Sequence, residues 1–187
     1  MPILTRETEL FPENLFDLEG VGEIAELRWT AVYTLSRYEK EFMRRLQARN
    51  VAFYGPTVAK RNKSPGGRVR TSYVPVFANY VFICGDESAR HAALTTNCVS
   101  RCIDVPDGVE LTRDLRQLYR LIDVGSPLTL EARLQPGTRV RVKSGMLHGQ
   151  EGTILTRHGE TRLLVAVNFL QQGASVLLED CDVEPVM

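Results

Sequence analysis

The chain has 187 residues, of which 43% are hydrophobic and 25% are charged. This length suits one ordinary domain or two small ones, and the composition excludes collagen-like, coiled-coil and low-complexity classes. No apolar run approaches the roughly 20 residues that a membrane-spanning helix needs. The acidic N-terminal segment is the opposite of a secretory signal, so we expect a cytoplasmic protein.

A net charge of zero conceals a strong asymmetry along the chain. Residues 1–27 carry seven acidic side chains and one basic one, whereas residues 28–75 carry eleven Lys or Arg and two Glu. A locally basic segment in a neutral chain indicates either a surface for a polyanion or an acidic protein, or a solvated charged face.

The first predicted elements are a leader, a strand and a helix. Residues 1–26 show no sustained hydrophobic period, and we interpret them as an acidic flexible leader. Residues 28–35 are rich in aromatic and β-branched side chains, which predicts a buried strand. Ser36 and Glu39 then fit a capping box at the start of a helix that ends near Asn50.

The rest of the first domain alternates strands and helices, which indicates an α+β class. A turn at 64–67 flanked by Lys and Arg predicts a basic hairpin tip. Asp86 is expected to cap one helix and Thr112 another. The other expected elements are strands at 51–54, 57–60, 72–83 and 99–105, and helices at 87–95 and 112–123.

The pattern of apolar residues and glycines changes after residue 134. Short runs rich in Val and Leu are separated by turns that contain glycine, a rhythm typical of a small β-barrel. Glycines at this density disfavour helices, so we expect strands here rather than a helical hairpin. The expected division is a domain at 27–124, a linker at 125–134 and a barrel at 135–187.

No catalytic or metal-binding pattern emerges. Cys98 and Cys102 form a C-x3-C spacing with no second pair, and two small buried thiols explain it better than a metal site. Glu39 and Glu41 point to different sides of the predicted helix, so they do not form an acid–base pair. We therefore expect neither an enzyme nor a bound cofactor.

Three stretches carry a family resemblance. They are Trp29 with the helix start at 36–39, the run Pro75-Val-Phe-Ala-Asn-Tyr-Val-Phe82, and the segment from Gly137 through Gly152. Together they resemble the NusG family of transcription elongation factors, in which an NGN domain precedes a KOW domain. The family run commonly reads Pro-Leu-Phe-Pro-Gly-Tyr-Val-Phe. Asn79 and the basic hairpin are closer to specialised RfaH-like members than to housekeeping NusG.

The resemblance covers about residues 27–187 and implies a fold and a function. The fold is an NGN-type antiparallel sheet flanked by helices, followed by an SH3-like KOW barrel. The function is transcription elongation and antitermination, in which the NGN domain binds the clamp helices of the RNA polymerase β′ subunit and suppresses pausing or termination. Residues at or near the motif are expected to make that contact: Phe53, Tyr54, Val76, Phe77 and Tyr80. Because side chains alternate along a strand, a core role for each of them stays open.

The resemblance also implies further partners. Basic side chains of the first helix and one beyond the second are expected to meet non-template DNA or nascent RNA: Arg37, Lys40, Arg44 and Arg101. Phe169 matches a barrel-loop aromatic that meets a ribosomal protein or Rho, although a role as a barrel plug stays open. The alternative function is an RNA-binding or ribosome-associated KOW module, since KOW segments also occur in such proteins.

Overall fold

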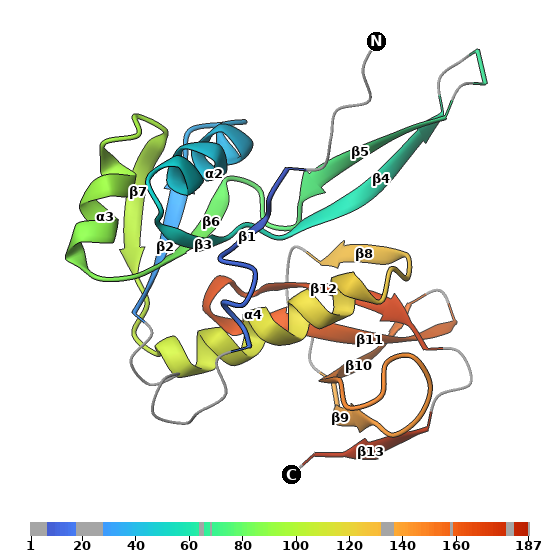
Figure 1. Cartoon of the computed structure of the whole chain (residues 1–187). Coiled ribbons are helices and arrows are strands. Elements are labelled where there is room, and N and C mark those ends of the chain that lie inside the picture. The colour runs from blue at the N-terminus through green and yellow to red at the C-terminus, as the bar shows by residue number, and fades with distance from the viewer. Residues whose placement is uncertain are drawn as a thin grey trace. The chain divides into compact units, whose positions relative to one another are not determined.

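The computed structural model describes two compact units, residues 1–109 and 110–187. The first contains a five-stranded antiparallel sheet and a separate two-stranded ribbon, and the second a six-stranded antiparallel sheet (Figure 1). This confirms the expected α+β class. None of the described helices is long and apolar enough to cross a membrane. The described residues are 7–17, 28–63, 66–67, 69–131, 137–157, 159–178 and 182–186.

Two helices pack on one face of the five-stranded sheet, which we call the helix face. Apolar side chains of helix α2 (Glu39–Ala48) are buried with Val32, Val81 and Ile83 of the sheet, because the hydrophobic effect favours removing them from water. The strands, in the sheet order β1-β3-β6-β2-β7, are β1 (Leu10–Phe11), β3 (Ala52–Tyr54), β6 (Tyr80–Cys84), β2 (Trp29–Thr34) and β7 (Val99–Asp104). The helices are α2 (Glu39–Ala48) and α3 (Glu87–Leu94).

The opposite face of the sheet, here the second face, carries the alternate residues of each strand. Val32 points to the helices, so Ala31 and Tyr33 point away from them. Cross-strand partners share a face, and Tyr33 is opposite Tyr80 of β6 and Arg101 of β7. The second face is therefore rich in aromatic side chains.

Residues 7–17, which we expected to belong to a flexible leader, form part of the first unit. Strand β1 pairs with β3, and the Phe16 ring stacks on Trp29 at a centroid distance of 6.3 Å. The same ring meets Tyr54 edge to face at 5.1 Å. A two-residue strand followed by a turn has no period to detect, which is why the pattern of residues indicated disorder. Residues 1–6 and 18–26 of the expected leader lie outside the described residues.

The acidic residues of this segment also make specific contacts. The carboxylate of Glu9 is buried and accepts hydrogen bonds from the backbone N–H and the hydroxyl of Thr57. Glu7 pairs with Arg44 of α2 at 2.8 Å. Glu7 therefore links this segment to a basic side chain of the region that follows it in the sequence.

The apolar run 72–83, expected as one central strand, is two strands separated by a turn. Its first part lies in β5 (Val69–Pro75), which pairs with β4 (Thr57–Lys63) in a ribbon that extends away from the sheet (Figure 1). The chain then turns, with the N–H of Tyr80 donating to the carbonyl oxygen of Phe77 at 3.1 Å. Asn79 holds this turn in the left-handed region with φ 66°.

The expected capping box at Ser36 and Glu39 is wrong. Helix α2 begins at Glu39, and its N-cap residue Tyr38 makes no side-chain capping bond. The buried Glu39 carboxylate instead accepts a hydrogen bond from the N–H of Asn79 at 2.9 Å. The Glu39 side chain therefore binds a turn that is distant in sequence instead of capping its own helix.

Helices α3 and α4 show one confirmed cap and one incorrect one. The Asp86 carboxylate accepts from the N–H of Ala89 at 3.1 Å, as the sequence predicts. Helix α4 (Gly108–Asp123) begins before Thr112, which is buried in the helix rather than capping it. Helix α4 lies almost wholly within the second compact unit, which begins at Glu110.

The second unit combines α4 with short antiparallel strands. The short strands expected after residue 134 are present, and none of the unit's described residues beyond α4 forms a helix longer than η1 (Asn168–Leu170). Strand β8 occupies part of the expected linker, and β13 was not expected. In sheet order the strands are β13 (Val183–Pro185), β9 (Arg139–Val142), β10 (Glu151–Arg157), β11 (Glu160–Val167), β12 (Gln172–Leu177) and β8 (Leu128–Glu131).

The packing of Phe16 gives a direct test of whether residues 7–17 belong to the fold. Phe16→Ala should lower the free energy of unfolding by about 3 kcal/mol, because it removes a buried ring from its contacts with two aromatic side chains. Urea denaturation followed by tryptophan fluorescence measures this change. Glu13→Ala, at an exposed position in the same segment, is the control. Equal stability of the two variants would mean that the segment is a free leader.

The left-handed turn gives a second test. Asn79→Ala should be less stable than Asn79→Gly by about 1 kcal/mol, because a Cβ is disfavoured at positive φ and both variants lose the same side-chain amide. Thermal and urea unfolding of the two variants measures the difference. If the alanine variant were the more stable of the two, the turn would not have this conformation.

Candidate functional site

Three side chains form a partly exposed row across the second face, which we call the tyrosine–arginine row. The rings of Tyr33 and Tyr80 meet edge to face at 5.0 Å, and the guanidinium of Arg101 lies 5.1 Å from the Tyr33 ring centroid. The side-chain amide of Asn79 donates to the Tyr33 hydroxyl at 3.2 Å. Three neighbouring strands and the turn therefore fix the row in one arrangement.

Most of the residues expected to bind polymerase are buried. Phe53 belongs to the core beneath the helices, Tyr54 packs against Phe16, and Phe77 packs against Phe82 at 6.1 Å. Phe53 and Tyr54 are 0% exposed, Phe77 is 1% and Val76 is 6% exposed, and of the five expected residues Tyr80 alone is partly exposed.

Sequence reasoning missed Tyr33 as a site residue. The signal was present in the alternation of residues 28–35, which places Trp29, Ala31 and Tyr33 on one face of the strand. What the strand pattern could not show is that this face lies beside Tyr80, since that depends on which strands pair and in which register.

The basic residues expected to bind nucleic acid are not gathered on one surface. Arg101 lies on the second face, whereas Lys40 and Arg44 belong to α2, which packs on the helix face. Arg37 occupies the tight turn between β2 and α2, with φ 67°. The structure thus brings Arg101 to the tyrosines instead of to the helix.

Two of the basic side chains on α2 are neutralised within the protein. Arg44 pairs with Glu41 at 2.7 Å and with Glu7 at 2.8 Å, and Arg45 pairs with Glu41 at 2.7 Å. The hydrogen bonds from Arg44 and Arg45 lower the pKa of Glu41 from its ordinary value. The helix consequently presents less net positive charge than its sequence suggests.

Phe169 lies on η1 of the second unit and is partly exposed. The preceding residue, Asn168, is held by α4: its backbone N–H donates to Asp114 at 2.8 Å and its side-chain amide to Glu110 at 3.1 Å. Burial raises the pKa of Asp114 to about 6, against a smaller opposing effect of the Asn168 hydrogen bond. Within this unit, α4 therefore fixes the segment that carries Phe169.

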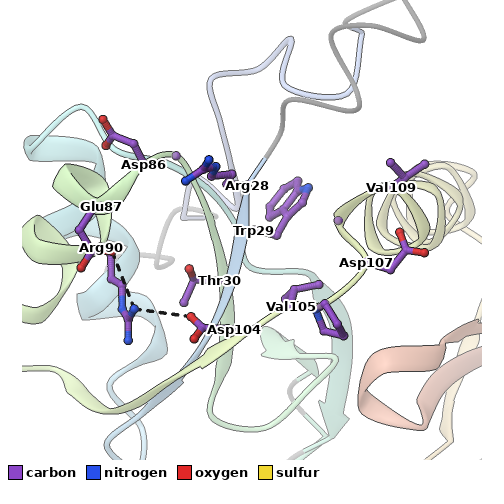
Figure 2. A pocket seen from close by; sticks show the side chains of 13 residues that line it. Arg28, Trp29, Thr30, Asp86, Glu87, Arg90, Asp104, Val105, Asp107 and Val109 are labelled. Atoms are coloured by element: carbon purple, nitrogen blue, oxygen red, sulfur yellow. Dashed lines mark ion pairs between the residues drawn. The ribbon is translucent and has the colours of Figure 1, made fainter.

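A cavity of about 490 Å³ opens where β2 begins and β7 ends (Figure 2). Trp29 lines it, and Arg90 spans it to Asp104 at 3.6 Å. None of the expected site residues lines this cavity. In the part of the chain that the structure describes, no group of His, Cys, Asp or Glu is arranged to hold a metal ion. Burial raises the pKa of the Cys84 thiol to about 11, which disfavours the reactive thiolate at neutral pH.

Comparison with known proteins identifies the first part of the chain. No curated protein matches it. The solved structure titled "Domain interaction in Thermotoga maritima NusG" is similar, with 21% sequence identity, a TM-score of 0.42, and coverage of 86% of this chain and 98% of that one. Residues 27–118 match the family model NusG, described as "Transcription termination factor nusG". The chain therefore carries a NusG-family domain over residues 27–118.

Proposed function

We propose that the protein is a cytoplasmic transcription elongation and antitermination factor that binds RNA polymerase through the tyrosine–arginine row. The observation that carries this proposal is the exposure of Tyr80 and Tyr33 beside the family's motif run, where the other aromatic side chains of the run are buried. A surface that keeps two tyrosines and an arginine partly open to solvent has the composition of a protein-interface hot spot.

The geometry of the row supports tight binding. Arg101 is held over the Tyr33 ring and Tyr33 is held by Asn79, so little side-chain freedom is lost when a partner docks. The rings offer apolar contact area, while the hydroxyls and the guanidinium offer hydrogen bonds. Such a surface suits an amphipathic helical partner, and we assign to it the clamp helices of the β′ subunit.

The proposed action follows from binding across the polymerase cleft. A factor with higher affinity for the closed clamp than for the open one shifts the population toward the closed state and so suppresses pausing or termination. Contacts to non-template DNA or nascent RNA are assigned to Arg37, Lys40, Arg44 and Arg101. Of these, the ion pairs of Arg44 make it the weakest contributor.

The second unit is proposed to act as the KOW domain. Phe169, partly exposed on η1, is the residue assigned to contact with a ribosomal protein or Rho. Because α4 binds the neighbouring Asn168, the segment that carries Phe169 is already ordered before a partner binds.

The polymerase contact is tested by replacing both tyrosines. Tyr33→Ala with Tyr80→Ala should weaken binding to purified RNA polymerase core enzyme at least about tenfold, because hot-spot side chains dominate interface affinity. Biolayer interferometry measures the dissociation constant, and circular dichroism checks the fold. Tyr38→Ala is the matched control, since Tyr38 is an exposed tyrosine outside the row.

Two outcomes would count against the proposal. Unchanged polymerase binding by a folded double variant would remove the row from the interface. Binding of the parent protein to a free RNA hairpin, without any affinity for polymerase, would favour the RNA-binding KOW module instead.

A further inference from the structure

We propose that the β4–β5 ribbon is a separate binding element for duplex DNA. The sequence from residue 56 to residue 75 contains five Lys or Arg and no Asp or Glu. Among the described strands, β4 and β5 pair only with each other, and the ribbon extends away from the sheet (Figure 1). This inference does not depend on the polymerase contact, which uses a different surface.

The charges of the ribbon are exposed and lie on both of its faces. Asn62 is directly opposite Arg70, so the strand alternation places Lys60 and Arg70 on one face and Arg61 and Lys63 on the other. The side chains of Lys60, Arg61, Lys63 and Arg70 are all exposed. The structure pairs none of them with a carboxylate among the residues that it describes.

The contrast with α2 makes the ribbon the better candidate for a polyanion. The α2 side chains Arg44 and Arg45 are held by Glu41 and Glu7, so a phosphate would have to displace existing ion pairs. These four described side chains of the ribbon are uncompensated, and each can replace a condensed counterion on a nucleic acid.

The shape of the ribbon favours a DNA duplex. A two-stranded β-ribbon fits the major groove of B-form DNA, whereas the major groove of A-form RNA is too narrow for it. Each strand has seven residues and therefore a length of about 20 Å. The face of Lys60 and Arg70 also carries Asn62 and Ser72, whose side chains hydrogen-bond to each other at 3.3 Å. This face presents hydrogen-bonding side chains of the types that contact base edges and phosphates.

The alternative, an acidic protein, fits the ribbon less well. Protein interfaces are depleted in lysine and need buried apolar anchors at their centre. Among the described side chains of β4 and β5, Val69 is the one large apolar residue that is exposed. Charge without an apolar centre is the composition of a nucleic-acid surface.

The experiment uses the full-length protein and a fluorescein-labelled DNA duplex, with anisotropy measured over a range of salt concentrations. The ribbon variant replaces Lys60, Arg61, Lys63 and Arg70 with alanine. It should bind the duplex at least about tenfold more weakly at moderate salt, and the slope of log affinity against log salt should fall by about 3 to 4. A Lys60→Arg, Lys63→Arg variant should bind like the parent, because it keeps the charge.

The matched control removes four exposed basic side chains elsewhere: Arg49, Arg113, Arg120 and Lys143, each to alanine. It should retain most of the duplex affinity, and the ribbon variant should retain polymerase binding. Equal affinities of the control and ribbon variants would overturn the proposal. So would ribbon-dependent binding that is as strong for a single strand, or for an RNA duplex of the same sequence, as for the DNA duplex.

Discussion

The left-handed turn at Asn79 is the point on which the first unit depends. Its backbone N–H donates to the buried Glu39 carboxylate of α2 at 2.9 Å. Its carbonyl oxygen accepts from the N–H of Thr34 in β2 at 2.8 Å, and its side-chain amide donates to the Tyr33 hydroxyl at 3.2 Å. One residue at φ 66° thus joins helix α2, a central strand and the tyrosine–arginine row. Asparagine and glycine are the residues that enter this region most readily, which explains why the turn can be built on an asparagine.

The turn also divides the chain into parts with different surroundings. Before it, β5 belongs to a ribbon that is basic and exposed; after it, β6 is buried in the centre of the sheet. The helix face of the sheet is covered by α2 and α3, and part of the second face is covered by Phe16 and its neighbours. The exposed remainder of the second face is where the proposed polymerase contact lies.

Local signals predicted much of the fold, and long-range contacts account for the rest. Asp86 caps α3 as expected, because an N-cap depends only on residues three positions away. The capping prediction for Glu39 was wrong because this side chain binds Asn79, which is distant in sequence. The run 72–83 looks continuous by hydrophobicity, and only the conformation of Asn79 reveals the break.

The candidate site was also predictable only where its residues carry a local signal. The motif located Tyr80, but burial of Phe53, Tyr54 and Phe77 depends on packing that no single stretch of sequence contains. Tyr33 became visible as a site residue only from strand register. Likewise, the basic charge of α2 was evident, whereas its neutralisation by Glu7 required the fold of residues 7–17.

The most direct measurement of the central claim is site-specific photo-crosslinking to RNA polymerase. A photoreactive phenylalanine derivative placed at position 80, in the tyrosine–arginine row, should cross-link to the largest polymerase subunit in the clamp region. The same group at position 38, beside α2, should give no such product. A cross-link from position 38 together with none from position 80 would contradict the account, because it would place the polymerase on the helix side of the domain.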